Sequence, residues 1–421
     1  MAFAGGRPRG RSLESGGAIG LKGVGIGMTT GSTDRKPWHR RLAFRLSVRG
    51  LIALVFLFGG SLGWWLHLAR VQREAVAFLS RRGVGIDYGG QYFDGSYRYA
   101  ETTPPGWLVD LVGYDALRPV IAIGTQPNAN PAFGDDEMAA VGRLDHLEVF
   151  GAFDALNLTD AGLARLRGNL RLKQLIIGHS ARLTGPGLAH LSTLYQLEDL
   201  QYPMTRLHDA DLAPLAGLSR LRELILTCGE GSTVGDAGLE HLAGLRELRT
   251  LGIDGYSKFS NEGLALIGGM GRLEHLSLNG SRITDLKGLA PLVGLKSLNL
   301  MRVPVDDAGM APIARFPGLM HLTLADNPAV TDAGLVHLQG LADLQSLDLR
   351  NCRVTDAGLA HILGCPRLVY LDLSGTQLSD AGLALLVKNK RYSFTGVSKT
   401  RVTPEGVRAA KAIRPGQAIR D

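Results

Sequence analysis

One sequence unit recurs along most of the chain and restricts what the chain can fold into. Its clearest copy covers residues 344–362, LQSLDLRNCRVTDAGLAHI, where LxxLxL precedes VTDAGLxxL. The first half predicts a short strand with one apolar side, and the second half a helical turn. A unit recurring every 22 to 28 residues indicates a solenoid. The units start at Leu144, Leu172, Leu197, Leu221, Leu248, Leu273, Leu295, Leu319, Leu344 and Leu368.

A single unit has too little apolar surface to fold alone, because its strand and helix share one buried edge. Stacked units would share a continuous leucine core, with each repeat contacting mainly its neighbours. Thr331 and Thr355 sit where a hydroxyl can cap the first free N–H groups of a helix. Asp332 and Asp356 follow at the positive end of the same helices. The sequence therefore predicts an α/β solenoid, curved like a horseshoe, with parallel strands on its concave face.

The TDAGL turn and the Leu-Pro or Cys-Pro-Xaa-Leu spacing resemble a known family over residues 144–407. That family is the cysteine-containing and ribonuclease-inhibitor-like leucine-rich repeats. The arginine-rich start, one apolar segment and Trp107-Leu108 are similar to bacterial single-span membrane-tethered proteins with such repeats. Eukaryotic proteins with this repeat type are often substrate receptors of ubiquitin ligases, joined through an F-box. An apolar segment occupies the place of that module in this sequence.

Residues 51–69 (LIALVFLFGGSLGWWLHLA) predict one transmembrane helix. At 1.5 Å per residue they span about the hydrocarbon thickness of a bilayer, and Trp64 and Trp65 suit the interface. Cations are more numerous on the N-terminal side, which places the N-terminus in the cytoplasm and the repeats outside. A signal peptide cleaved near Ala77, giving a secreted form, is the alternative.

Two short patterns lie inside this apolar segment. Gly59 and Gly63 form a small-xxx-small pair through which two anchors could associate weakly. Residues 59–63 also match the GxSxG pattern of hydrolases. That pattern requires a strand–turn–helix context, whereas Ser61 lies in the middle of an apolar helix. We therefore expect no hydrolase here.

Composition and charge divide the chain into six predicted parts. The net charge is +7, but residues 1–82 alone carry 14 Lys/Arg against 3 Asp/Glu, so the remainder is slightly acidic. An acidic repeat body argues against a nucleic-acid partner. The parts are a disordered basic cytoplasmic tail (1–48), a transmembrane signal anchor (49–70), a juxtamembrane helix and aromatic connector (71–106), an N-terminal cap (107–143), the repeats (144–390) and a C-terminal cap and tail (391–421).

We find no constellation that predicts catalysis, a metal or a cofactor. The repeated aspartates are explained by helix starts, and the histidines at matching helix positions by duplication of one unit. Cys228, Cys352 and Cys365 form no even-numbered disulfide framework and are expected to be small buried thiols. We expect no enzymatic activity.

The outward strand positions are the candidate binding surface, because solenoids usually bind on the strand-lined concave face. The face is mixed in sign, which favours a protein or peptide partner, although a merely solvated face is the alternative. Phe150, Ile176, Ile225 and Tyr370 are candidate anchors, since exposed aromatic and aliphatic residues carry most interface energy. The full candidate set is Glu148, Phe150, Ile176, Gln201, Ile225, Asp254, Asn279, Asn299, Asp348, Arg350, Tyr370 and Asp372.

The sequence as a whole predicts a membrane-anchored, non-catalytic protein that binds another protein on its concave face. Two alternatives stay open. One is a cytosol-facing scaffold or an adaptor like an F-box ubiquitin-ligase receptor. The other is a structural component of the cell envelope.

Overall fold

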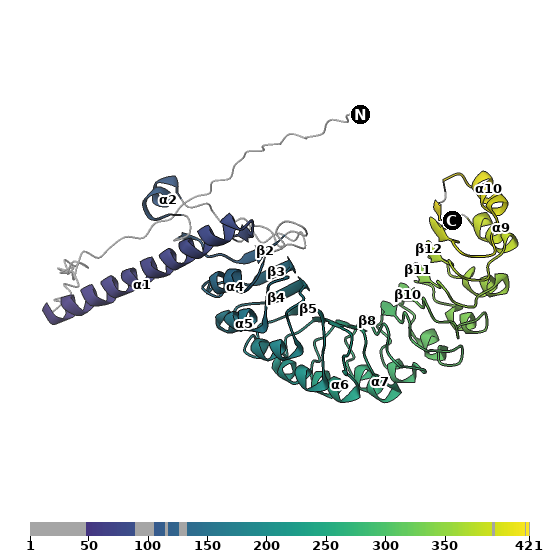
Figure 1. The fold of residues 1–421 in the computed structure, drawn as a ribbon, viewed down its shortest axis with the longest axis horizontal. Helices are drawn as coiled ribbons and strands as arrows, with labels where there is room; N and C mark the ends of the chain where they lie inside the picture. The colour runs from purple at the N-terminus through teal and green to yellow at the C-terminus, as the bar shows by residue number, and fades with distance from the viewer. Residues whose placement is uncertain are drawn as a thin grey trace, which may run out of the picture. The chain divides into compact units, whose positions relative to one another are not determined.

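The computed structural model describes residues 48–88, 105–113, 117–125, 133–389, 392–416 and 418–420. It divides into two compact units, Met1–Phe58 and Gly59–Asp421. The predicted tail, except for Val48, and residues 89–104 of the connector lie outside the described residues. Within the second unit the strands line the inner side of a curve and the short helices its outer side (Figure 1). The predicted α/β solenoid is confirmed.

The described strands form one sheet in chain order, β1 to β14. β1 pairs antiparallel with β2, and every later neighbour is parallel. The strands are β1 (Gly85–Asp87), β2 (Ala122–Gly124), β3 (Val149–Asp154), β4 (Gln174–His179), β5 (Asp199–Thr205), β6 (Glu223–Cys228), β7 (Thr250–Gly255), β8 (His275–Ser277), β9 (Ser297–Asn299), β10 (His321–Thr323), β11 (Ser346–Asp348), β12 (Tyr370–Asp372), β13 (Phe394–Gly396) and β14 (Ala418–Arg420).

The outer side consists of short α-helices and 3-10 helices, while one long helix precedes the sheet. The α-helices are α1 (Val48–Arg81), α2 (Gly106–Val112), α4 (Asp135–Val141), α5 (Asp160–Leu163), α6 (Asp236–Leu242), α7 (Asn261–Gly268), α8 (Leu359–Ile362), α9 (Asp380–Lys388) and α10 (Pro404–Ile413). The 3-10 helices are η1 (Ala164–Gly168), η2 (Gly185–Leu191), η3 (Asp209–Gly217), η4 (Lys287–Leu289), η5 (Ala311–Arg315), η6 (Gly334–Leu338) and η7 (Asp356–Gly358).

The core is a column of leucines that repeats in register from strand to strand. Leu322 pairs with Leu298 on one side and with Leu347 on the other, and all three are buried. Cys352 is also buried, and its Sγ donates to the carbonyl of Leu324 at 3.1 Å. Each repeat thus buries its apolar edge against its neighbours, as the repeat pattern predicts.

The aspartate of the TDAGL turn links each repeat to the next. Asp332 accepts from the backbone N–H of Thr355 at 2.8 Å and from its hydroxyl at 2.6 Å. The Thr355 hydroxyl in turn caps its own helix by accepting from Ala357 N at 3.2 Å. Equivalent links join Asp135 to Thr159 and Asp307 to Thr331. The sequence predicts the caps, whereas the connection between repeats appears only in the structure.

The first repeat is shifted relative to its expected start. Phe150 pairs in register with Ile123 and Leu175, so Leu147, and not Leu144, is the equivalent of Leu172. Phe150 is fully buried, and its ring lies 5.6 Å from that of Phe133. The prediction that Phe150 is an exposed anchor is therefore wrong. In a strand, a shift by an odd number of residues moves a side chain to the opposite face.

Helix α1 continues beyond its apolar half into contact with the first strands. Ala75 and Leu79 are buried in the solenoid core, and Gln72 Nε2 donates to Arg118 O at 2.8 Å. Within the described residues, Gly50–Arg81 is long and apolar enough to cross a membrane, and its apolar window is exposed throughout. A membrane anchor and a signal sequence both have these properties.

Candidate functional site

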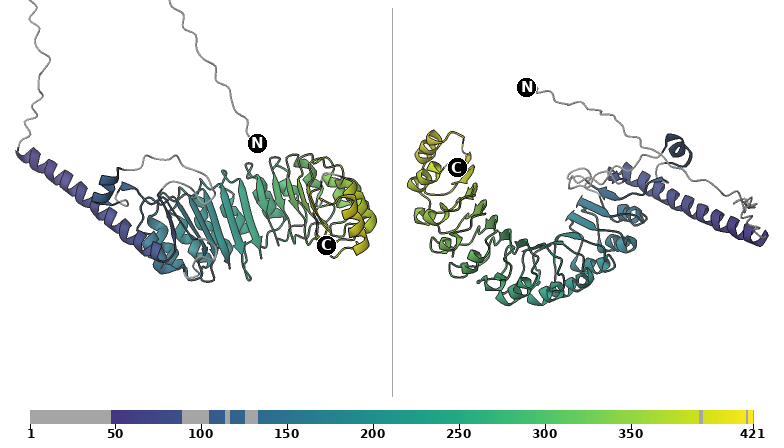
Figure 2. Two further views of the ribbon diagram at one scale, coloured as in Figure 1. Left: turned by 90° about the horizontal axis from the view of Figure 1, so that it is seen from above. Right: turned by 180° about the vertical axis from the view of Figure 1, so that it is seen from behind.

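The strands that form the concave face differ in length. β3 to β7 have six or seven residues, whereas β8 to β14 have three, so the face is widest along the strand direction at β3 to β7. Figure 2 shows the strands running across this face. The predicted residues fall there in separate groups. Ile176, Gln201 and Ile225 share one register position on β4, β5 and β6. Asp348 and Asp372 lie at the same register position further along the sheet, on β11 and β12.

A groove of about 770 Å³ lies beside the first group. Ile177 and Tyr202 are buried beneath it, while Gln201 and Ile225 line it and are half-buried. Further lining residues include Phe153, His179, Pro203 and Thr227. The groove is thus mainly apolar with a few polar groups, as is usual for ligand sites.

A bulge in β5 shapes this groove. The register between β5 and β6 shifts between Tyr202 and Thr205, next to Pro203. Proline has no N–H to donate and is found in sheets at such irregular positions. The Tyr202 hydroxyl donates to Thr184 O at 2.9 Å, and burial raises the Tyr202 pKa well above its ordinary value. The Tyr202 side chain is therefore neutral, and its hydrogen bond holds it in place at the base of the groove.

A row of polar side chains lies on β4 to β6, and Gln201 of this row lines the groove. Gln174 Nε2 donates to Asp199 Oδ2 at 2.6 Å, and Gln201 Nε2 donates to Glu223 Oε1 at 3.1 Å. Burial, with a smaller contribution from Glu223, raises the pKa of Asp199 to about 6. Asp199 Oδ1 is buried and accepts no hydrogen bond from the described residues.

A second group lies near the C-terminal end of the sheet. The rings of Tyr370 and Phe394 stack at 4.6 Å with an angle of 4° between their planes. Arg350 Nε donates to Asp348 Oδ2 at 2.9 Å, and this pairing, together with Asp372, raises the Arg350 pKa above its ordinary value. Tyr370 is 37% exposed, so this stack offers a flat aromatic surface beside a paired arginine.

Several predicted contact residues already bond within the chain. Asn299 Oδ1 accepts from Met301 N at 3.1 Å, and Asp372 Oδ1 accepts from Ser374 N at 3.0 Å. Asp254 Oδ1 likewise accepts from Asn279 N at 3.1 Å. These carboxylates and amides hold the chain where it turns out of a strand.

Glu148 also differs from its expected position. It precedes β3, and its Oε2 accepts from Lys173 Nζ at 2.8 Å. Equivalent flank pairs join Glu198 to Arg222 and Glu274 to Arg249. The Glu148 prediction therefore needs correction: this residue belongs to a charged flank of the solenoid. The cause is the same misplaced start of the first repeat.

The described residues contain no group of three or more His, Cys, Asp or Glu side chains placed to hold a metal ion. Burial raises the pKa of both the Cys228 and the Cys352 thiol to about 12, so neither is a thiolate near neutral pH. Cys365 is also buried, with a raised thiol pKa.

Sequence reasoning missed Phe153, Pro203 and Thr227 of the groove. These residues lie beyond the LxxLxL core of each repeat, where β3 to β6 continue. The change from short to long strands has no simple pattern in the sequence. Pro203 within a strand-like stretch was the one available signal of a bulge.

Comparisons with known proteins agree with this fold. A family model described as Leucine Rich repeat matches residues 341–363 and 364–387. A chain of the yeast Rad7 and Elc1 complex has a TM-score of 0.56 at 15% identity, covering 89% of this chain and 97% of its own. An internalin (inlF) from Listeria monocytogenes has a TM-score of 0.51 at 16% identity, covering 72% and 86%. A comparison with curated proteins finds no match. These similarities concern the fold.

Proposed function

We propose that this leucine-rich repeat protein is a non-catalytic, membrane-tethered receptor that binds a protein partner on its concave face. Leucine-rich repeat domains are typically protein-binding scaffolds, and the family model that matches this chain is described as Leucine Rich repeat. The groove lined by Gln201 and Ile225, with Ile176 at the same register position on β4, carries the proposal. The TDAGL turns and the buried Cys352 favour the cysteine-containing or ribonuclease-inhibitor-like repeat type.

The groove combines two features of a protein-binding centre. Ile225 and Pro203 offer apolar surface that a partner side chain can cover, and such buried contacts carry most interface energy. Gln201 lines the groove and donates to Glu223, whose carboxylate adds negative charge on the neighbouring strand. A partner segment with an apolar residue beside a lysine or arginine would satisfy both.

The stack of Tyr370 on Phe394 is a second contact point on the same sheet. It lies several repeats away from the groove, so an extended partner would reach both. Exposed aromatic rings beside paired charges are common at interfaces.

The apolar half of α1 is the proposed membrane anchor. Trp65, Leu68 and Ala69 border a hollow that also contains Arg143 and Asp145, and charged groups avoid the hydrocarbon whereas tryptophan suits its interface. The spanning part would then begin after Arg49 and end near His67, so that residues 51–67 at 1.5 Å each cover about 26 Å. The excess of cations before it favours a cytoplasmic N-terminus and repeats outside the cytoplasm. An added Cβ at Gly59 or Gly63 meets no atom within 4 Å, so both positions are open to a second anchor.

The groove is tested by reversing its apolar character. The double variant Ile176→Arg and Ile225→Arg, made in the full chain, should no longer co-purify with the partner protein. When the purified protein and its purified partner are mixed, the Kd of their complex should rise about tenfold or more. The control is Val336→Arg with Leu385→Arg, because these side chains are exposed (44% and 47%) on η6 and α9, away from the concave face. A partner retained by the groove variant but lost by the control would contradict the proposal.

A further inference from the structure

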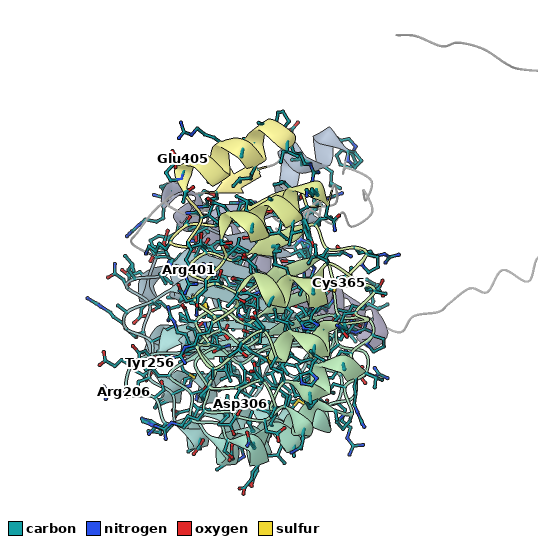
Figure 3. The ribbon with its side chains drawn as sticks, turned by 90° about the vertical axis from the view of Figure 1, so that its right-hand side faces the viewer. Arg206, Tyr256, Asp306, Cys365, Arg401 and Glu405 are labelled. Carbon is teal, nitrogen blue, oxygen red and sulfur yellow. The ribbon has the colours of Figure 1, made fainter. Side chains whose placement is uncertain are left out.

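A second hollow of about 680 Å³ lies at the edge of the solenoid, among the turns that follow β6 to β9. We call it the edge pocket, defined by Tyr256, Ser257, Lys258, Arg282 and Arg302. Figure 3 labels Arg206, Tyr256 and Arg401 toward one lateral edge and Cys365 toward the opposite one. The edge pocket is therefore distinct from the groove on the concave face.

Three cations converge on the edge pocket from successive repeats. Lys258 and Arg282 follow the buried ladder residues Ser257 and Ser281, so they occupy equivalent positions in neighbouring turns. Both side chains are exposed, and within the described part of the chain neither forms an ion pair. Adjacent strands lie about 4.8 Å apart, which sets the spacing of these cations.

Arg302 adds the third cation from a strained backbone. Its φ is 57°, while the equivalent residues before it are Gly255 and Gly280, with φ of 101° and 77°. A non-glycine residue in the left-handed region is strained, and such residues gather at functional sites. Asp326, at the same position of the next repeat, is short and tolerates this conformation. Lys399 has a φ of 56° at the equivalent position of a later repeat, so a long basic side chain recurs at this strained position.

Arg302 remains available to a ligand. Its Nε lies 3.3 Å from Asp326 Oδ2, but its side chain is 67% exposed. An exposed pair of this kind contributes little, and a guanidinium has further N–H donors. Tyr256 beside it is 59% exposed and provides an aromatic face.

The arrangement of charged residues around the edge pocket indicates which class of anionic ligand fits it. The three cations lie on neighbouring turns, with Asp326 on one side and Glu230, next to Arg206, on the other. A nucleic acid or a sulfated polysaccharide, with charge on every unit, would place anions against these carboxylates. A short acidic peptide can place two or three carboxylates on the cations and no more.

We propose that the edge pocket binds an acidic segment of a protein, in which carboxylates pair with Lys258, Arg282 and Arg302 and an aromatic side chain lies on Tyr256. Charge-assisted hydrogen bonds of this kind are stronger than neutral ones, and arginine can donate two parallel N–H bonds to one carboxylate. This site goes beyond the concave groove and does not depend on it.

The test uses the full chain in detergent and a fluorescein-labelled peptide with two glutamates on each side of a phenylalanine. A peptide with glutamine in place of glutamate is the control ligand. In fluorescence anisotropy at low salt, Lys258→Ala with Arg282→Ala should weaken binding of the acidic peptide about tenfold. Arg353→Ala, an exposed cation in a later turn, should change binding less than about twofold.

Arg302→Gly separates function from stability. It removes the charge and relieves the backbone, so binding should weaken about threefold to tenfold while the melting temperature stays equal or rises. Equal binding of the glutamine peptide, or wild-type affinity in these variants, would overturn the proposal. So would tighter binding of heparin oligosaccharide or inorganic phosphate that the same variants abolish, because either ligand would indicate a different anion class.

Discussion

At the scale of the residue, the TDAGL turn is a device for joining repeats. Its aspartate reaches the cap of the following helix, and its glycine leaves room for the aspartate of the preceding repeat. At Gly358, an added Cβ would lie 2.4 Å from Asp332 Oδ1 and 2.9 Å from Leu335 Cδ1. The glycine is therefore required by a neighbouring repeat, while its own backbone conformation is ordinary.

Gly358→Ala should lower the free energy of unfolding by about 1 to 3 kcal/mol, because the methyl group displaces the Asp332 carboxylate from Thr355. Gly364→Ala in the same repeat is the matched control, since its added Cβ would meet no atom within 4 Å. Urea denaturation followed by circular dichroism measures both. Equal losses in the two variants would refute the steric account.

Asp199 predicts a pH dependence of stability. Its pKa is about 6 in the folded chain, against an ordinary value of 3.8, so the folded chain binds this proton more tightly. Its contribution to stability is therefore complete below about pH 4 and is lost as the pH rises through 6. Asp199→Asn should raise the melting temperature by about 2 °C at pH 8 and leave it unchanged at pH 4. A difference that is independent of pH would show that the ionisation of Asp199 is not responsible.

At the scale of the element, the two halves of α1 differ in their surroundings. Its apolar first half is exposed, whereas Ala75 and Leu79 in its second half are buried in the solenoid core. Arg73 also donates to Val112 O of α2 at 2.7 Å. The proposed anchor thus continues into the capped end of the solenoid as one helix of 34 residues.

This arrangement predicts an uncleaved anchor with external repeats. A tag after Asp421 should stay with membranes through a carbonate wash and be digested when protease is added to intact cells or spheroplasts. A tag protected from protease would favour the cytosol-facing scaffold. A soluble tag on a shortened chain would indicate cleavage near Ala77 and would refute the anchor.

At the scale of the whole molecule, the two proposed sites lie on different surfaces of one repeat array. The groove uses strand residues of β3 to β6, whereas the edge pocket uses the turns after β6 to β9. Each repeat contacts mainly its neighbours, so a substitution at one site should leave the other unaffected. A large partner could contact both sites, and the separate variants described above would then show additive losses.

The sequence by itself determined the repeat, its period, the buried leucines and thiols, and the caps at Thr331 and Thr355. These features depend on patterns within one unit, where side-chain periodicity and helix capping act locally. Ile176, Gln201 and Ile225 could also be placed on the concave face, because they flank core residues of regular strands.

Only the tertiary structure decided the register of the first repeat, which buries Phe150 and moves Glu148 to the flank. The bulge at Pro203, the link from Asp332 to Thr355 and the convergence of Lys258, Arg282 and Arg302 were decided there as well. Each of these features joins residues about one or more repeats apart. Their relative positions depend on how whole repeats stack, which no pattern within a single unit specifies.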